Sequence, residues 1–159
     1  MNRRSAIKQL FIIAGGIAIA TSCDLSSNAT SIELKNIQMV KKDEQLLAAY
    51  VEAILPKTDS PGAKELNLHL FVMKMLDDCS SPEDQKLFLE SLKAAHEQKA
   101  NTAEEILAYL KGLPEGDKFF SILKWRTIQG YKNSEYVMKN KLKYELVPGR
   151  YNGEFLINA

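Results

Sequence analysis

The distribution of apolar residues along the chain predicts a succession of helices. Between residues 43 and 142, apolar side chains recur every three or four positions, which is the spacing of one helix face. Prolines, glycines and small polar residues interrupt this pattern at intervals, as they do between helices. Helices are predicted over about 43–55 and 65–78, from 82 through 95, from 103 to about 112, from 117 through 131 and from 135 to about 142.

Capping residues mark three of the predicted helix starts. Ser81 precedes Pro82, which suits a first helical position because proline lacks an amide hydrogen that would be unpaired there. Thr102 and Glu105 have the spacing of a capping box, in which each side chain bonds to the other residue's backbone amide. Ser134 opens the last and shortest helix. These signals divide the second half of the chain into separate helices.

The fold class follows from this pattern. The sequence contains no series of alternating strands and no internal repeat. From Tyr144 to Gly153, turn residues stand among aromatic ones, which predicts an extended segment. We therefore expect an all-α fold, a single small bundle-like domain of five to six helices with an extended C-terminal segment. The third helix is expected to bury Leu89, Leu92 and Ala95.

The first 22 residues have the character of an export signal. A basic start that contains Arg3, Arg4 and Lys8 precedes an apolar run over 10–20. This run is shorter than the roughly 20 residues that a relaxed membrane span needs. The adjacent arginines favour the twin-arginine route, which carries folded proteins. The alternative is an ordinary secretory signal whose basic start contains two arginines.

Cys23 directly follows three small residues and is a candidate site of lipid attachment. Acylation there would anchor the protein to the envelope membrane, on its periplasmic side. The alternative is a simple cleavage site beside an incidental cysteine. On this basis the chain divides into an export signal (1–22), an anchor site with a flexible tether (23–42) and a helical domain (43–159).

Charge and cysteine content limit the kinds of function. The full chain has 21 basic and 20 acidic residues, and removal of the signal takes away three basic ones, so the mature chain is near −2. Such a balance does not favour nucleic acid as a partner. The two cysteines, Cys23 and Cys79, do not form a disulfide framework if the first is acylated. We expect Cys79 to be a small residue at a helix end.

No catalytic or cofactor-binding motif is recognisable. The two histidines are far apart and belong to no zinc-protease or haem-attachment pattern, and no glycine-rich nucleotide loop or nucleophile elbow is present. We expect His69 to be a hydrogen-bonded helix histidine rather than a ligand, and His96 to lie on the surface. The sequence thus gives no support to an enzyme with its own active site, metal or cofactor.

Adjacent acidic residues and a run of aromatic residues are further candidate sites. The acid pairs 77–78 and 104–105 point about 100° apart on a helix, so they do not form a facing acid–base pair. We expect them on solvated faces or at helix caps. The aromatic residues over 119–131 are expected mainly in the core, with contact to a partner as the alternative for Trp125.

Three segments carry a family resemblance. They are Ile54–Ala63, a loop with two prolines and a glycine, then Phe119–Glu135, and finally Tyr144–Gly153. In this order and spacing they resemble the gluconate 2-dehydrogenase subunit 3 family. The resemblance covers about residues 43–153. One position departs from it, because Glu154 stands where members of the family often have cysteine.

The resemblance implies a non-catalytic subunit of an oxidoreductase complex. Such a subunit binds a large catalytic subunit of the glucose–methanol–choline type, which holds the FAD and oxidises a sugar or sugar acid, and a cytochrome c subunit often takes the electrons onward. The partner would be exported on this subunit's signal. Residues expected to contact the partner, or to shape the surface that does, are Lys57, Thr58, Asp59, Pro61, Gly62, Trp125, Gly130, Tyr131, Ser134, Glu135, Pro148, Gly149 and Tyr151.

A different class of function stays open at this point. Glu154 and Cys23 are also compatible with a freestanding envelope lipoprotein that serves as a binding or scaffold module. The two hypotheses differ in whether a flavin-containing dehydrogenase accompanies this chain.

Overall fold

The computed structural model describes residues 28–98, 100 and 102–142, and helices are the only regular secondary structure in this part of the chain. The predicted all-α fold is confirmed. In chain order the helices are α2 (Lys41–Ile54), α3 (Leu68–Cys79), α4 (Pro82–Glu97), α5 (Ala103–Gly112), α6 (Lys118–Lys132) and α7 (Glu135–Asn140).

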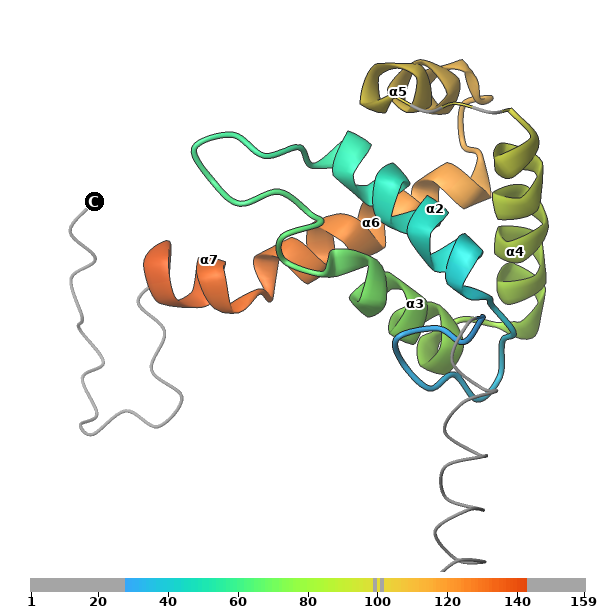
Figure 1. Ribbon diagram of the computed structural model, residues 1–159, viewed down its shortest axis with the longest axis horizontal. Helices are drawn as coiled ribbons and strands as arrows, with labels where there is room; N and C mark the ends of the chain where they lie inside the picture. The colour runs from blue at the N-terminus through green and yellow to red at the C-terminus, as the bar shows by residue number, and fades with distance from the viewer. Residues whose placement is uncertain (1–27, 99, 101, 143–159) are drawn as a thin grey trace, which may run out of the picture.

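Helices α2 and α6 are the two central helices among the described residues. Helix α6 packs against α2, α3, α4 and α7, and α2 packs against α3, α4, α5 and α6. Figure 1 shows α2 crossing in front of α6, with α4 at one side and α7 extending from the other. The end of α6 that leads into α7 therefore projects beyond the rest of the helices. None of the described helices is long and apolar enough to cross a membrane.

Aromatic side chains from three helices meet in the core. Tyr50, Phe88 and Phe119 are fully buried, and the ring centroids of Phe88 and Phe119 lie 4.9 Å apart. The inner face of α4 is formed by Phe88, Leu92 and Ala95. Leu89, which we expect in this face from the sequence, is only half-buried, because α4 is oriented so that Phe88 points to the core instead. Full burial of a leucine or phenylalanine such as Leu92 or Phe88 stabilises the fold by about 1.5–3 kcal/mol relative to exposure.

The predicted caps are present. The Ser81 hydroxyl accepts a hydrogen bond from the Asp84 amide at 3.1 Å, and Thr102 and Glu105 form the reciprocal capping box. Ser134 accepts from the Val137 amide at the start of α7. Each cap satisfies a backbone amide that has no partner within its own helix.

Helix α3 begins three residues later than the sequence predicts. Asn67 has a φ of 52°, in the left-handed region, which an α-helix cannot continue through. Its amide donates to the Lys64 carbonyl at 3.1 Å, so the residues before α3 form turns instead. Asparagine tolerates this conformation better than most residues with a side chain.

The segment before α2, residues 28–40, packs on the helices. The amides of Lys35, Asn36 and Ile37 donate to the Asp77 carboxylate at 2.9, 2.6 and 3.0 Å. Ile37 and Met39 are buried. The structure thus differs here from the flexible tether predicted over 23–42, whose remaining residues up to 27 lie outside the described part.

Asp77 is a buried carboxylate and not a solvated one. It is 1% exposed, while its neighbour Asp78 is exposed. Burial alone raises the pKa of Asp77, but the hydrogen bonds from the amides of residues 35–37 outweigh this effect and hold the pKa below its usual value. Lys74 adds a positive charge 3.5 Å away. The carboxylate therefore remains ionised and holds the N-terminal segment in place.

Glu44 makes the second attachment of this segment. Its carboxylate accepts hydrogen bonds from the amide and hydroxyl of Ser31, both at 2.6 Å, and pairs with Lys41 at 3.2 Å. Burial raises the pKa of Glu44, and the bonds from Ser31 and Lys41 lower it by more, so the net shift is downward. The N-terminal segment is thus fixed to α2 through Glu44 and to α3 through Asp77.

Candidate partner interface

The loop between α2 and α3 projects from the helices and has a defined shape (Figure 1). Its ends are joined by the hydrogen bond from the Ala63 amide to the Leu55 carbonyl, at 2.9 Å. Within it, the Thr58 amide donates to the Ser60 carbonyl at 3.1 Å. Lys57, Thr58 and Asp59 are exposed, so three of the predicted contact residues are accessible to a partner.

Gly62 has a packing role in this loop. It is buried, and a Cβ atom there would lie 2.5 Å from a carboxylate oxygen of Glu52 and 2.8 Å from the Lys57 amide nitrogen. Glu52 accepts a hydrogen bond from the Lys64 amide at 2.7 Å, so its carboxylate cannot readily move aside. Glycine is required for the loop to close on α2.

Gly130 has a similar role between α3 and α6. A Cβ atom at this position would lie 2.8 Å from a ring carbon of Phe71. Four residues later, Ser134 both caps α7 and donates its hydroxyl to the Tyr131 carbonyl at 2.7 Å. Gly130 and Ser134 therefore determine how α6 approaches α3 and turns into α7, while Tyr131 is half-buried beside them.

The residues that follow the Ile54–Ala63 segment lie across a groove from the end of the Phe119–Glu135 segment. A shallow groove of about 320 Å³ separates the end of the α2–α3 loop from the junction of α6 and α7. Its lining residues are Glu65, Leu66, Asn67, Leu68, Phe71, Gly130, Asn133, Ser134 and Glu135. The third segment, Tyr144–Gly153, lies outside the described residues.

Trp125 stands on the outer surface of α6. It is 66% exposed, and Ile128, one turn further along the helix, is 38% exposed. Phe119, in contrast, is buried, while Phe120 and Tyr131 are half-buried. The expectation of a core position is thus correct for Phe119 and wrong for Trp125. The indole is the largest exposed apolar side chain among the described residues.

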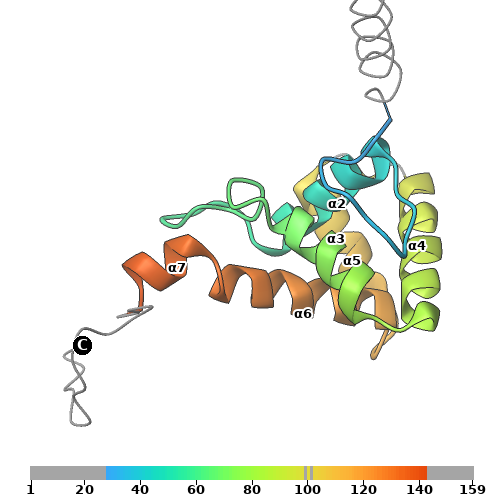
Figure 2. The same cartoon turned by 90° about the horizontal axis from the view of Figure 1, so that it is seen from below.

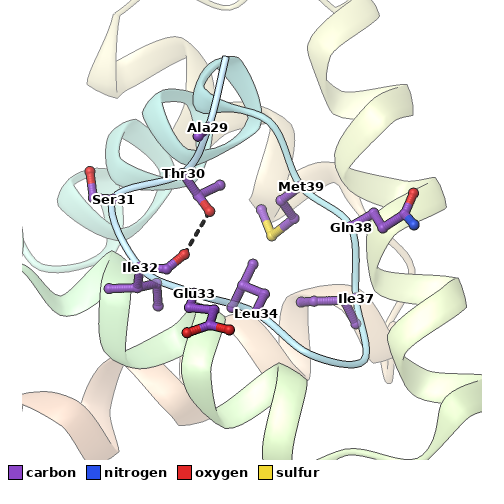
Figure 3. A pocket seen from close by; sticks show the side chains of 9 residues that line it. All are labelled: Ala29, Thr30, Ser31, Ile32, Glu33, Leu34, Ile37, Gln38 and Met39. Carbon is purple, nitrogen blue, oxygen red and sulfur yellow. Dashed lines mark hydrogen bonds between the residues drawn. The ribbon is translucent and has the colours of Figure 1, made fainter. Parts of the chain in front are cut away.

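A hollow lies within the N-terminal segment. It measures about 460 Å³ and is lined by residues 29–34 and 37–39. Figure 3 shows Leu34 and Met39 pointing into the space that this segment encloses, while Ser31 turns outward. The Thr30 hydroxyl donates a hydrogen bond to the Ile32 carbonyl at 2.7 Å, and this bond fixes the backbone on one side of the hollow. The only carboxylate on the lining is Glu33, so the hollow does not bring together groups for acid–base chemistry.

The histidines occupy different environments. His69 is 9% exposed, and its Nε2 lies 4.0 Å from a carboxylate oxygen of Glu44, whereas its Nδ1 has no hydrogen-bond partner among the described residues. Burial lowers the pKa of His69, and the Glu44 charge opposes this only in part. His96 is exposed, as expected. In the part of the chain that the structure describes, no three His, Cys, Asp or Glu residues are grouped to hold a metal ion.

The comparison with protein families decides the classification. The profile described as gluconate 2-dehydrogenase subunit 3 matches residues 41–111 and 100–149. The chain belongs to this family. The resemblance seen in the sequence is confirmed, and the name of the family denotes a component of a multi-subunit dehydrogenase. Comparison with curated proteins and with solved structures gave no match.

The family match encloses the described helices and the accessible residues of the candidate interface. The predicted residues that are accessible there are Lys57, Thr58, Asp59, Trp125 and Glu135. Gly62 and Gly130 are explained by packing, Ser134 by capping, and Pro61 lies half-buried in the loop. The remaining predicted site residues lie outside the described residues; they are Arg3, Arg4, Lys8, Cys23, Pro148, Gly149 and Tyr151.

Sequence reasoning missed the two carboxylates that hold the N-terminal segment, Glu44 and Asp77. A signal for the segment was present in its apolar residues, which are Ile32, Leu34, Ile37 and Met39. The acidic pair 104–105, in contrast, lies where we expect it, exposed in the first turn of α5, and Cys79 is the last residue of α3.

Proposed function

We propose that this chain is a non-catalytic accessory subunit that binds and stabilises a dehydrogenase acting on a sugar or sugar acid. The catalytic subunit of such a complex, of the glucose–methanol–choline type, would hold the FAD and carry out the oxidation. Membership of the gluconate 2-dehydrogenase subunit 3 family supports this proposal. The chain itself contributes a helical domain with a loop and a helix face directed toward solvent.

The exposure of Trp125 is the observation that carries the proposal. The opposite side of α6 is fully occupied, because Phe119, Leu123 and Thr127 are buried there. The fold therefore does not need an aromatic residue at position 125. Tryptophan is enriched among the residues that dominate protein–protein binding energy, where it fills a pocket on the partner. An exposed indole within a family-matched segment is accordingly a candidate anchor for the catalytic subunit.

Export and location form part of the same proposal. The arginine pair, Arg3 and Arg4, with Lys8 would direct this chain to twin-arginine transport, and Cys23 would carry a lipid anchor on the periplasmic side of the envelope. A flavoprotein that acquires FAD in the cytoplasm has to cross the membrane folded. Travel on the signal of a bound accessory subunit satisfies this requirement. A cytochrome c subunit would then accept the electrons.

Co-purification tests the proposal. The tagged native chain is isolated in mild detergent, and flavin absorbance and mass spectrometry identify what accompanies it. We expect a yellow complex with a large oxidoreductase, lost in Trp125→Ala and retained in Val40→Ala. Val40 is a suitable control because it is apolar and 46% exposed, and it lies outside α6. A colourless wild-type chain from cells that contain the dehydrogenase would instead favour the freestanding lipoprotein.

A further inference from the structure

Charge is unevenly distributed between two parts of the domain. Residues 118–142, which contain α6 and α7, have six basic side chains and one acidic side chain. Residues 28–117 have ten basic and sixteen acidic ones. The near-neutral mature chain therefore combines a basic region with an acidic remainder. A segregated charge of this kind steers association with a partner of opposite charge.

Four of the six basic side chains have no ion pair with a carboxylate among the described residues. Lys118 pairs with Asp84 and Lys139 pairs with Glu135. The remaining four make other contacts or none, and they are Lys124, Arg126, Lys132 and Lys141. Their positive charge is not neutralised within the described domain.

Two of these cations flank the exposed apolar residues of α6. Lys124 precedes Trp125, and Lys132 lies one turn beyond Ile128. These two lysines and the two apolar residues between them are all exposed. We call Lys124, Trp125, Ile128 and Lys132 the outer face of α6.

The surface around Trp125 is uneven. The indole borders a hollow of about 180 Å³ that also contains Ile128, Gln129 and Lys132. It also borders a second hollow of about 210 Å³, formed by α6 with the end of α3 and the start of α4. Trp125 is thus a ridge between two depressions, a shape that matches projecting side chains on a rigid partner.

We propose that the outer face of α6 binds an acidic surface of a folded protein. Carboxylates of that surface would pair with Lys124 and Lys132 on either side of an apolar site that receives the Trp125 indole. Identification of this protein as the catalytic subunit rests on the proposed function. Beyond the proposed function, the partner's surface is acidic, and Lys124, Trp125 and Lys132 recognise it.

A protein partner fits this face better than a lipid bilayer does. Two exposed apolar residues between two depressions offer little continuous surface for insertion into lipid. Figures 1 and 2 also place the N-terminal segment and α6 on opposite sides of α3. The five residue steps from Cys23 to Asn28 span at most about 18 Å. A lipid anchor at Cys23 would therefore hold the side of the domain opposite α6 next to the membrane.

Charge reversal combined with a spectroscopic probe tests the proposal. Affinity of the mature full-length chain for the purified flavoprotein is measured at low and moderate salt. The variant is Lys124→Glu with Lys132→Glu. The control is Lys93→Glu with Lys111→Glu, which makes the same charge change at exposed positions of α4 and α5. Because Trp125 is the only tryptophan, 5-fluorotryptophan labelling gives a single ¹⁹F signal that reports on the outer face of α6.

We expect the α6 reversal to weaken binding by at least about 10-fold at low salt, the control to change it by less than about 2-fold, and wild-type affinity to fall as salt rises. The ¹⁹F signal of the wild type should shift on addition of the flavoprotein. Unchanged affinity of the α6 variant would overturn this proposal while leaving the proposed function intact. Failure of the wild type to bind would overturn both. A ¹⁹F shift with phosphatidylglycerol vesicles but none with the flavoprotein would assign the face to lipid and also overturn it.

Discussion

The Asp77 carboxylate accepts a hydrogen bond from the Ile37 amide at 3.0 Å, although the two residues are 40 positions apart. Together with the bonds from Lys35 and Asn36, this contact makes residues 28–40 part of the folded domain. Ile37 is buried as a result. The attachment determines where the chain leaves the domain toward Cys23, and hence which side of the domain an anchor there would hold near the membrane.

Removal of the Asp77 charge should release the N-terminal segment. In Asp77→Asn, the amides of residues 35–37 lose a charged acceptor, which costs about 1–3 kcal/mol of unfolding free energy. Hydrogen exchange of these amides should accelerate strongly, while that of α6 amides should change only with global stability. The matched control is Asp78→Asn, which alters an exposed carboxylate on the same helix. Equal effects of the two variants would contradict the role assigned to Asp77.

Acid should destabilise the domain in two separate steps. Burial lowers the pKa of His69 from its usual 6.5, although Glu44 opposes this shift while Lys41 and Lys64 add to it. The unfolded chain then binds more protons than the folded one, and stability falls as the pH drops below about 6.5. His69→Gln should remove this first step. Urea denaturation at a series of pH values measures it, and an unchanged profile in the variant would contradict the assignment.

The second step belongs to the carboxylates that hold the N-terminal segment. The pKa values of Glu44 and Asp77 lie below their usual 4.5 and 3.8 because hydrogen bonds to the ionised forms outweigh the effect of burial. The contribution of these two carboxylates to the free energy of unfolding is complete above pH 4.5. It is lost as the pH falls toward their pKa values in the folded state. In Asp77→Asn, the loss of stability below pH 4.5 should be smaller than in the wild type. A steeper loss would show that these groups do not stabilise the fold.

Gly130 should not tolerate a side chain. Gly130→Ala places a Cβ atom 2.8 Å from the Phe71 ring, and overpacking of this kind costs about 1–3 kcal/mol. Gly112→Ala is the control, because a Cβ atom at that position in α5 meets nothing within 4 Å and alanine favours a helix. Thermal unfolding of both variants gives the comparison. If Phe71→Leu restores the stability of Gly130→Ala, the contact between α3 and α6 is the cause.

Export of the flavoprotein should depend on the arginine pair. Substitution of Arg3 and Arg4 by lysine keeps the charge of the signal but removes the feature required by twin-arginine transport. We expect the FAD-containing partner to accumulate in the cytoplasm. Lys8→Arg preserves both the pair and the charge and should leave export unchanged. Periplasmic flavoprotein at wild-type levels in the double lysine variant would show that it does not travel on this signal.

Local features of the fold could be predicted from the sequence. The Ser81, Thr102 and Ser134 caps act over three residues, and the structure places each at its expected helix start. The start of α3 was missed because the left-handed conformation of Asn67 depends on the turns before it. The choice of Phe88 over Leu89 depends on the rotation of α4 against its neighbours, which the period of one helix does not determine.

The candidate interface was harder to predict, because its residues are defined by long-range packing. Apolar residues occur on all sides of α6, so their spacing alone could not show that Trp125 faces solvent while Phe119 faces the core. The role of Asp77 depends on a segment 40 residues away. The family could be predicted from the sequence, because three spaced segments identify it without reference to packing.

Sedimentation of the purified native complex, with absorbance recorded at both protein and flavin wavelengths, tests the central claim most directly. If this chain is an accessory subunit, it sediments together with the flavin signal as one large species, and Trp125→Ala separates the two while remaining folded. A wild-type chain that sediments alone and colourless beside an intact flavoprotein would contradict the claim.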